Sequence, residues 1–495
     1  MLKILNTAQI RDLDAYTIRN QPIASIDLME QACDAFVQWF AEHFDTSKKV
    51  GVICGTGNNG GDGLGIARIL TDWGFDVKVW IVKGGTSASE DFTSNLDRLK
   101  SRIKPEDYSL SADWMDREVL IDAIFGSGLS RPAEGIYAEA IDRINATAAV
   151  RVAVDIPSGL MADQRSTGAI VKARYTVTFQ LPKLAFFMPE NHPFVGEWQL
   201  VKIGLDKGFI KRTETPYNFV TRKSVQQIVR PPSRFDHKGD NGKALLIAGG
   251  LGKMGAAILS ARGALRAGVG LLTVHVPSVG YNIIQTAVPE AMASIDPHDH
   301  FFSVPPDFQP YDVVGVGPGI GQAHETVEGL RKVLLSGKRM VLDADALNII
   351  SAHKELISMI PKGSILTPHP GEFERLAGHW SDDFERLRKL IDFSNHTGSI
   401  VVLKGAFTAI ATPSGKVYYN SSGNPGMATG GTGDVLTGIL TAMLAQGYES
   451  KEAAILGVYL HGLSGDLAAK EKTMHALIAS DLADYVPSAF KILIG

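Results

Sequence analysis

The chain alternates short β-rich runs with segments of helix or turn, and it does so in two separate series. The first series runs from residue 48 to 205, and the second begins at residue 243. Between them, residues 206–236 lose the pattern, and the two prolines of "RPPSRFDHKGD" break any continuing helix. Such alternation is typical of a parallel sheet wrapped by helices. We therefore expect an α/β protein with two domains, residues 1–218 and 219–495.

Length and charge agree with this division and narrow the function. A chain of 495 residues, 45% of them hydrophobic, is too long for one ordinary core. The two series share no register of identical residues, which indicates a fusion of two units and not a repeat. A net charge of -4 gives no general attraction to nucleic acid or anionic lipid, so any binding of phosphate must be local.

The sequence contains few signals that indicate a cellular compartment. The start "MLKILNTAQIRDLD" turns polar early, and the apolar part of the 435–446 segment is too short to span a bilayer. Cys33 and Cys54 lack metal-site spacing and lie in apolar surroundings, which favours buried thiols in a reducing compartment. We expect a cytoplasmic protein with neither a membrane nor a nucleic-acid partner.

The first glycine loop lies in "VGVICGTGNNGGDGLGIARIL", a predicted strand, loop and helix. Gly55, Gly57 and Gly60 satisfy the dinucleotide fingerprint G-x-G-x-x-G, which is a weak signal by itself. The next strand ends in Lys83 and two glycines, without the acidic residue that holds a ribose. The pattern thus favours a phosphate cradle over a hydride-transfer site. A plain strand–helix turn with spare glycines is the alternative.

Polar side chains follow two further strands of this series. Asp122 closes one strand in "LIDAIFGSGLSRP", and Asp155 and Ser158 follow another in "VAVDIPSGL". A lone aspartate after a strand is usually a cap or turn former. Ligands in open α/β sheets collect at the carboxyl ends of strands, however, so these oxygens and that of Asn59 could bind a hard cation or transfer a proton.

The motifs "CGTGNNGGDGLGIAR", "DAIFGSGLSRP" and "VDIPSGL" resemble the YjeF N-terminal domain of NAD(P)H-hydrate epimerases, over roughly residues 1–215. The resemblance implies a Rossmann-like three-layer domain, hydrated NADH or NADPH as substrate, Asp155 as a catalytic residue, and a potassium ion on Asn59, Asp122 and Ser158. The implied substrate contacts are Asn58, Asn59, Gly60, Gly61, Asp62, Gly126, Ser127, Gly128, Leu129, Ser130, Arg131, Pro132 and Asp155. After "PSGL" the chain reads "MADQRSTG" where the family has an Asp-rich turn, and we expect this departure to affect the loop more than the chemistry.

The second series contains "GNPGMATGGTGDVLTGILTAMLAQG", residues 423–447, in which a run of glycines and Asp434 precede an apolar helix. Helical spacing of leucines and other apolar residues begins at Leu436, and Gly447 is a natural residue for the far end. Free amides at the helix start form a phosphate cradle, where Asp434 takes the proton of an attacking hydroxyl. A helix cap with a flexible lead-in is the plainer explanation of Asp434.

Other motifs of this half give weaker signals. Lys404 and Gly405 follow a strand in "VVLKGAFTAI", a position suited to a nucleotide, although such a lysine is usually only solvated. His369 lies between two helix-breaking prolines in "TPHPGEF" and is either an ordinary loop histidine or a ligand contact. "VGVGPGIG" reads as a glycine loop, and "DPHDH", residues 296–300, reads as a solvated loop and not a metal site.

"GGTGDVL" is similar to the signature of ribokinase-like small-molecule kinases. Together with "HKGDNG", "VGVGPGIG", "DADALN" and "TPHPGEF", it resembles the NAD(P)H-hydrate dehydratase family over roughly residues 225–495. The resemblance implies a ribokinase-like α/β domain that uses ADP, or ATP in some relatives, with Mg²⁺. The implied substrate contacts are Gly319, His369 and Asp434, the last also catalytic. The implied adenine-nucleotide contacts are Lys404, Gly405, Ala406, Phe407, Thr408, Asn424, Pro425, Gly426, Met427, Ala428, Thr429, Gly430, Gly431, Thr432 and Gly433.

The whole chain thus resembles proteins that join the two enzymes. By this resemblance, the first domain interconverts the C6 epimers of hydrated NAD(P)H, and the second dehydrates the S epimer at the expense of ADP, giving AMP and phosphate. One alternative is a small-alcohol or vitamin kinase with a non-catalytic nucleotide-binding domain, and another is an N-terminal half that only regulates. We expect a homo-oligomer. The sequence leaves open NADH against NADPH, ADP against ATP, and the identity of the epimerase base.

Overall fold

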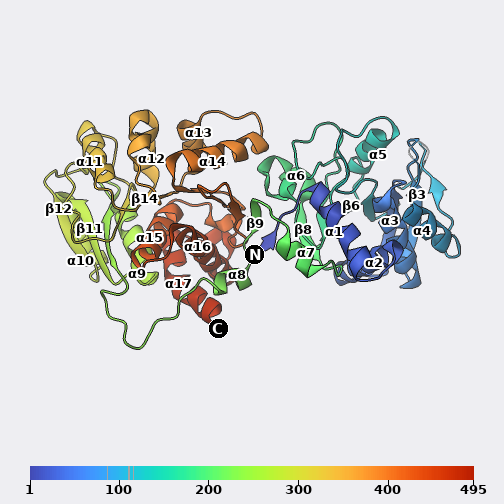
Figure 1. Ribbon diagram of the computed structural model, residues 1–495, viewed down its shortest axis with the longest axis horizontal. Helices are drawn as coiled ribbons and strands as arrows, with labels where there is room; N and C mark the ends of the chain where they lie inside the picture. Colours follow the sequence, from blue (N-terminus) through green and yellow to red (C-terminus); the bar gives the residue numbers. More distant parts are fainter. Residues whose placement is uncertain (86, 110–111, 115) are drawn as a thin grey trace. The chain divides into compact units, whose positions relative to one another are not determined.

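The computed structural model describes residues 1–85, 87–109, 112–114 and 116–495, which form two compact units (Figure 1). The N-terminal unit comprises Lys3–Thr215 with Asp382–Phe384, and the C-terminal unit comprises the remaining described residues. The boundary that we expected after residue 218 falls inside a strand of the C-terminal unit, β9 (Tyr217–Phe219). Each unit has its own sheet and its own apolar core.

The N-terminal unit is built on a seven-stranded sheet with the order β4-β3-β2-β5-β6-β7-β8. Every neighbouring pair is parallel, which confirms the predicted sheet type. The strands are β2 (Lys49–Cys54), β3 (Asp76–Ile81), β4 (Glu106–Asp107), β5 (Val119–Ala123), β6 (Val150–Val154), β7 (Tyr175–Phe179) and β8 (Glu197–Val201).

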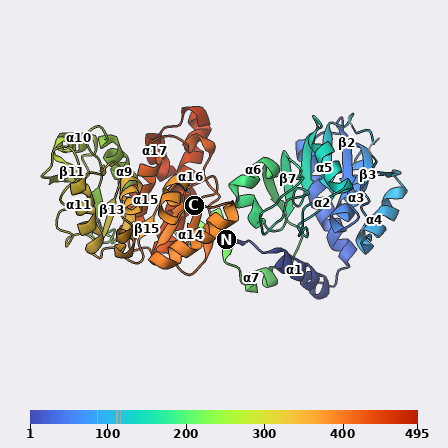
Figure 2. The ribbon, with the colours of Figure 1, turned by 90° about the horizontal axis from the view of Figure 1, so that it is seen from above.

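Alternation along β2 separates two apolar clusters. Val50 and Val52 join a cluster with Phe36 of α2, whereas Ile53 joins one with Ile141 of α5, because successive strand residues point to opposite faces. Helices therefore cover both faces, giving three layers (Figure 2). The helices are α1 (Thr7–Asn20), α2 (Ser25–His43), α3 (Asn58–Asp72), α4 (Glu90–Lys100), α5 (Ile136–Asn145), α6 (His192–Val195) and α7 (Lys207–Arg212).

The C-terminal unit contains an eleven-stranded sheet with the order β1-β9-β18-β17-β16-β15-β14-β13-β10-β11-β12. The run from β16 to β12 is parallel, but β17 is antiparallel to both of its neighbours. The strands not yet given are β1 (Leu2–Lys3), β10 (Lys243–Ile247), β11 (Leu271–Pro277), β12 (Met292–Asp296), β13 (Val313–Val316), β14 (Met340–Leu342), β15 (Ile365–Leu366), β16 (Ile400–Leu403), β17 (Ala409–Ala411) and β18 (Val417–Tyr419). The sequence pattern did not predict β1, β9, β12 or β18.

The main apolar core of this unit includes residues from Val220 to Leu493, and many of them belong to its last three long helices. The helices of the unit are α8 (Arg222–Gln226), α9 (Met254–Arg266), α10 (Tyr281–Ala287), α11 (His324–Leu335), α12 (Ala344–Ala352), α13 (Pro370–Ala377), α14 (Asp383–Thr397), α15 (Thr432–Ala445), α16 (Ser450–Lys472) and α17 (Ala479–Ile494). Three of these helices, α15, α16 and α17, follow β18. Helix α15 is buried from Val435 to Ala445, so its start is fixed by packing along its length.

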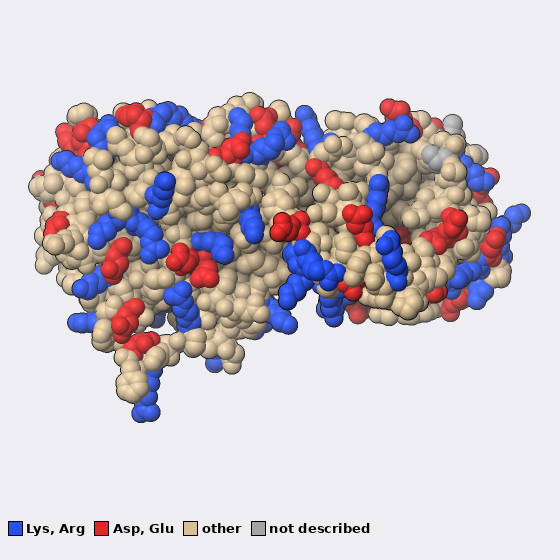
Figure 3. Space-filling model, viewed as in Figure 1, with Lys and Arg blue, Asp and Glu red and all other residues tan. Residues whose placement is uncertain are grey.

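Surface and cysteine features agree with the sequence analysis. Cys33 and Cys54 are free and buried, as predicted. Basic and acidic side chains are interspersed over the face drawn in Figure 3. Within the part of the chain that the structure describes, no helix is long and apolar enough to cross a lipid bilayer.

Candidate active sites

The first glycine loop joins β2 to α3 and is shaped by close backbone contact. A Cβ at Gly60 would lie 1.9 Å from the carbonyl oxygen of Gly55, so only glycine fits there. Helix α3 starts at Asn58. Among the described residues, the amides of Asn58, Asn59 and Gly60 have no acceptor, as expected for the first turn of a helix. Packing thus explains Gly60, and the free amides leave the helix start open to an anion.

Asp122 and Ser158 come together, as the strand-end argument predicted, and Asn59 lies against Gly126, the neighbour of the Phe125 that Ser158 contacts. Asp122 accepts hydrogen bonds from the Ser158 amide (2.7 Å, Oδ2) and hydroxyl (2.6 Å, Oδ1), and it is 1% exposed. No basic side chain in the described chain pairs with it, and burial raises the pKa of Asp122 to about 6 although the bonds from Ser158 oppose this. Asn59 is buried, and its Nδ2 has no partner in the structure as described. The cluster is a buried anionic pocket of oxygens without a counter-charge.

Asp155 has a different environment from Asp122. Its backbone is left-handed, with φ of 66°, an uncommon conformation for a residue other than glycine. Its Oδ1 accepts from the Phe179 amide (3.1 Å), the Thr178 hydroxyl (3.2 Å) and the ammonium of Lys183. The Lys183 side chain is only 2% exposed. Sequence reasoning missed Lys183, although it follows β7, the strand beside the one that ends at Asp155.

Asn59, Asp155 and Lys183 line a cavity of about 740 Å³, whereas Asp122 and Ser158 do not. The predicted contacts that line it are Asn58, Asn59, Asp62, Asp155 and residues 126–131, whereas Gly60, Gly61 and Pro132 do not. Helix α1 adds Asp14, which sequence reasoning also missed. Burial raises the pKa of Asp14 to about 6, and the charge of Asp155 adds to the rise. Burial also raises the pKa of Asp62 well above its ordinary value.

The second glycine loop precedes α15, which begins at Thr432, close to the expected start. Gly431 has φ of 91°, and the first-turn amides of Thr432, Gly433 and Asp434 have no acceptor in the described chain. The Nε2–H of His461 donates to the Thr432 carbonyl over 2.9 Å. Burial lowers the pKa of His461 to about 4, so the ring is neutral and holds the loop without adding charge. The start of α15 therefore has the open backbone amides that an anion-binding site needs, as the sequence predicted.

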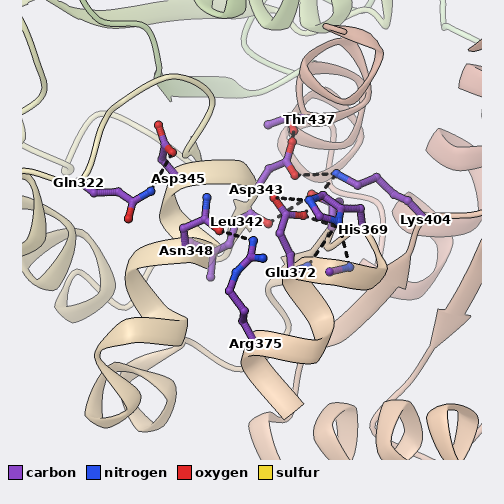
Figure 4. Close-up of polar contacts among 12 residues, drawn as sticks. Gln322, Leu342, Asp343, Asp345, Asn348, His369, Glu372, Arg375, Lys404 and Thr437 are labelled. Carbon is purple, nitrogen blue, oxygen red and sulfur yellow. Dashed lines mark hydrogen bonds and ion pairs between the residues drawn. The ribbon is translucent and has the colours of Figure 1, made fainter. Parts of the chain in front are cut away.

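Lys404 and two carboxylates converge beside this loop (Figure 4). The Lys404 ammonium donates to Asp343 Oδ1 (3.0 Å) and lies 3.9 Å from Glu372 Oε2. The Thr437 hydroxyl donates to Asp343 Oδ2 (2.8 Å). A Cβ at Gly433 would lie 3.5 Å from the Lys404 nitrogen. Asp343 and Glu372 were not predicted as site residues, although Asp343 follows β14 and the strand-end argument applies to it.

Asp434 has the protonation behaviour that a base needs at neutral pH. Burial raises its pKa to about 7, the charge of Asp343 adds to the rise, and Lys404 opposes it. A carboxyl that titrates near the working pH can take a proton and release it again. Its position in the first turn of α15 places it beside the free amides.

His369 and Pro370 form a helix start, which corrects the description of Pro370 as helix-breaking. Pro370 is the first residue of α13, where its missing N–H costs nothing. His369 Nδ1 accepts from the Gly371 amide (3.0 Å), while the His369 amide donates to Glu372 Oε2 (2.8 Å). His369 thus caps α13 and is half-exposed next to the Lys404 cluster, with its Nε2 3.6 Å from Glu372 Oε1.

The remaining predicted loops differ from one another. Gly319 has φ of 71° beside Gly321, whose amide donates to Asp345 Oδ2 (2.9 Å). Gly315 lies within β13 and not in the loop. The nucleotide-contact loop is tied to α16 by Asp466, which accepts from the Gly423 amide (2.9 Å) and Asn424 Nδ2 (3.0 Å).

The "DPHDH" segment is only partly solvated, contrary to our expectation. Asp296 is fully buried and accepts from His275 Nε2 (3.1 Å) and the Ser303 amide (2.8 Å), so it organises the turn after β12. Over the described residues, no group of three or more histidines, cysteines, aspartates and glutamates is arranged to hold a metal ion.

Comparison with known proteins matches both units. Residues 25–185 match the YjeF-related protein N-terminus, and residues 244–488 match the NAD(P)H-hydrate dehydratase family. A bifunctional NAD(P)H-hydrate repair enzyme of Thermofilum pendens is 35% identical over 99% of this chain and 97% of its own length. A ribokinase-like superfamily protein of Enterococcus faecalis aligns with a TM-score of 0.50 and 26% identity, over 57% of this chain and 99% of its own. An ADP/ATP-dependent NAD(P)H-hydrate dehydratase of Bacillus subtilis, co-crystallised with ATP and Mg²⁺, aligns with a TM-score of 0.48 and 31% identity, over 56% and 98%.

Proposed function

The chain belongs to the family of bifunctional NAD(P)H-hydrate repair enzymes, and we propose that residues 1–218 carry its epimerase and residues 219–495 its dehydratase. The observation that carries this proposal is the match to a bifunctional enzyme over 99% of the chain, with one glycine-loop site in each unit. The substrate is hydrated NADH or NADPH, in which water has added to C6 of the dihydronicotinamide ring. A small-alcohol or vitamin kinase is not favoured, because the relatives of full length are repair enzymes.

The epimerase half uses the 740 Å³ cavity of the N-terminal unit. The free amides at the start of α3 and the 126–131 segment bind the nucleotide, and Asp155 faces the reacting carbon. A potassium ion fits the oxygens of Asp122 and Ser158, with the Asn59 side-chain oxygen as the third ligand that the family resemblance implies, because the Asp122 carboxylate is 1% exposed and lacks a basic partner in the described chain. Such an ion balances the buried charge and fixes the loops that carry these residues.

The dehydratase half removes the hydroxyl as phosphate. Asp434 takes the proton of the 6-hydroxyl, whose oxygen then attacks the terminal phosphorus of ADP, and AMP leaves. The phosphate ester next eliminates phosphate as C5 loses a proton, which restores the C5–C6 double bond. The amides at the start of α15 and the Lys404 ammonium stabilise the charge on the transferred group. Only the S epimer fits this arrangement, so an epimerase is needed to recover the other.

Asp343 and Glu372 would be the residues of the C-terminal unit that hold Mg²⁺, in exchange for their contacts with Lys404. Asp343 and Glu372 are hard oxygen donors that converge on one ammonium, Lys404. When bound, Mg²⁺ neutralises charge on the phosphates of ADP. Lys404 and the residues Gly405, Ala406, Phe407, Thr408 and Asn424–Gly433 hold the adenine nucleotide.

The central experiment supplies mixed epimers of hydrated NADH with ADP and Mg²⁺ and follows the return of dihydronicotinamide absorbance. The unaltered protein converts both epimers in one continuous phase. Asp155→Ala gives a fast phase that consumes the S epimer, followed by a slow phase at the spontaneous epimerisation rate. Asp97→Ala, which changes an exposed aspartate on α4, serves as the matched control and behaves as the unaltered protein does.

Two results would contradict the division of labour. Loss of the fast phase in a folded Asp155→Ala protein would mean that the N-terminal site takes part in dehydration. A slow phase as rapid as in the unaltered protein would remove Asp155 from the epimerase. The expected homo-oligomer stays a prediction, which light scattering coupled to size-exclusion chromatography measures directly.

A further inference from the structure

Helix α1 is fixed across the N-terminal cavity by hydrogen bonds to distant loops. The Thr7 amide and hydroxyl both donate to Asp163 Oδ2 (2.7 Å each), and the hydroxyl also donates to the Ser127 carbonyl (3.1 Å). Arg11 donates to the Gly128 carbonyl (3.3 Å). Asp163 belongs to the "MADQ" run that departs from the family pattern. These bonds make α1 one wall of the cavity, and α1 precedes the 25–185 segment that matches the family.

Asp14 enters the cavity from this wall and has Asp155 as its main charged neighbour. The carboxylate of Asp155 disfavours a second negative charge nearby, so the proton is retained on Asp14, whose pKa burial and this charge raise to about 6. The other charged or titratable side chains that line the cavity are Arg11, Asp62, Asp91, Arg131, Tyr137 and Lys183.

The two oxygens of Asp155 are not equivalent. Oδ1 accepts three hydrogen bonds, including that from Lys183, whereas Oδ2 has no donor among the described residues. Lys183 is held in turn by the Thr178 hydroxyl (2.8 Å) and the Leu181 carbonyl (3.3 Å). A buried ammonium with this many acceptors is fixed in place, so it orients the carboxylate and compensates its charge.

We propose, building on the epimerase function above, that Asp14 and Asp155 are the acid and base of this cavity and that Lys183 is the positioning residue that orients the Asp155 side chain. Asp14 protonates the 6-hydroxyl, the C6–O bond breaks, and water leaves with the electron pair as the N1 lone pair forms a C6=N1 iminium bond. Water then adds to C6 from the opposite face and loses its proton to Asp155 Oδ2. Return of that proton to Asp14 completes the cycle, so no group is consumed. The carboxylates of the cavity stabilise the cationic intermediate.

The test measures epimerisation of purified hydrated NADH at several pH values, after subtraction of the spontaneous rate. In the unaltered protein, kcat/KM falls as pH rises through about 6, because Asp14 loses the proton that it donates. Asp14→Asn lowers kcat about 100-fold and removes this fall. Asp12→Asn, an exposed aspartate on the same helix, leaves both rate and profile unchanged. A fall near pH 6 that persists in Asp14→Asn overturns the assignment of the acid.

Lys183 is tested by chemical rescue. Lys183→Ala lowers kcat about 100-fold and changes KM less than threefold, and ethylammonium restores at least tenfold of the loss whereas ethanol restores none. If Lys183 is purely structural, ethylammonium and ethanol have equal effects on the activity of Lys183→Ala. That result overturns its assignment as a positioning residue. If Lys183→Ala does not fold, Lys183→Gln replaces it, and unaltered kcat in that variant is the overturning result.

Two readouts separate this inference from the proposed function. Dehydration of the S epimer by the same variants reports that the chain is folded. An unaltered protein that does not accelerate epimerisation contradicts the proposed function itself, whereas acceleration that is insensitive to both Asp14 and Lys183 contradicts only the acid–base assignment.

Discussion

The two glycine loops look alike in sequence but use glycine for different purposes. In the N-terminal loop, a Cβ at Gly60 would meet the Gly55 carbonyl oxygen at 1.9 Å, and one at Gly63 would meet the Ala123 Cβ at 2.5 Å. In the C-terminal loop, a Cβ at Gly430 would meet nothing within 4 Å, and one at Gly433 would approach only Lys404 and Asp343 of the site. Gly60 and Gly63 are therefore required by packing, whereas Gly430 and Gly433 leave room for a ligand. Gly426 and Gly431 are close-packed, since a Cβ at either would lie 2.6 Å from Met474 or Leu259, so the contrast holds for the residues that face the second site.

The largest expected effect isolates the carboxylate of the second loop. Asp434→Asn lowers the rate of dehydration about 1,000-fold, because it removes the base, and leaves adenine-nucleotide binding within about tenfold, or 1.4 kcal/mol. Epimerisation continues without recovery of reduced cofactor. Stopped-flow absorbance and calorimetric titration with ADP measure the two quantities. Asp484→Asn, at an exposed position on α17, is the control, and near-normal dehydration in Asp434→Asn would exclude it as the base.

A methyl group in the first loop breaks its packing. Gly60→Ala lowers the free energy of unfolding of the N-terminal unit by about 2–3 kcal/mol, since the backbone of Gly55 has no room to move. Urea denaturation followed by tryptophan fluorescence gives the value. A loss under about 0.5 kcal/mol would show that the loop accommodates a side chain and would remove the contrast between the loops.

The same substitution in the second loop acts on activity instead. Gly433→Ala keeps the stability within about 0.5 kcal/mol, because the nearest atom is the end of a flexible lysine at 3.5 Å. The added methyl group occupies space beside Lys404, so kcat/KM for ADP falls about tenfold. Steady-state kinetics and denaturation of the same preparation provide both numbers, and a destabilised protein with normal kinetics is the contrary outcome.

The smallest expected effect is on the free energy of unfolding, which the raised pKa of Asp434 lowers at alkaline pH. The pKa of Asp434 is about 7 in the folded chain, against 3.8 for an ordinary aspartate, so between these values the folded chain holds a proton that the unfolded chain has released. Stability therefore falls as pH rises from about 4 through 7. Asp434→Asn is more stable than the unaltered protein at pH 8 by about 1 kcal/mol, a figure discounted for partial exposure, and the difference vanishes near pH 4. Equal unfolding free energies at pH 8 would argue against the raised pKa.

Strand-end reasoning located much of both sites, because parallel strands bring their carboxyl ends together. It brought Asp122 and Ser158 to one place and Lys404 to the second glycine loop. It did not find Asp14, because α1 reaches the cavity through bonds between residues 7 and 163, for which no local pattern exists. Whether the resemblance assigns each contact its true role stays a prediction.

The directions of the strands were likewise predictable where they follow from local sequence and not where they depend on distant residues. Alternating β-rich and helical segments predicted the parallel strands correctly. The antiparallel pairing of β17 with β16 and β18 follows from short connections of a few residues, and β18 has only three residues, too few to show a period. The burial of Asp296 depends on His275 from another strand, and the polar run around it gave no sign of this.

The pairing of β9 with β18 decides where the two enzymes could be cut apart. Tyr217–Phe219 lie along Val417–Tyr419 and satisfy the backbone groups on that side of β18. A dehydratase fragment that starts at residue 219 loses most of β9 and exposes a three-residue apolar edge, which is a template for intermolecular β-pairing and aggregation. A fragment that starts at Pro216 keeps β9 in place. Residues 217–219, at the junction of the two enzymes, therefore also protect the second enzyme from aggregation.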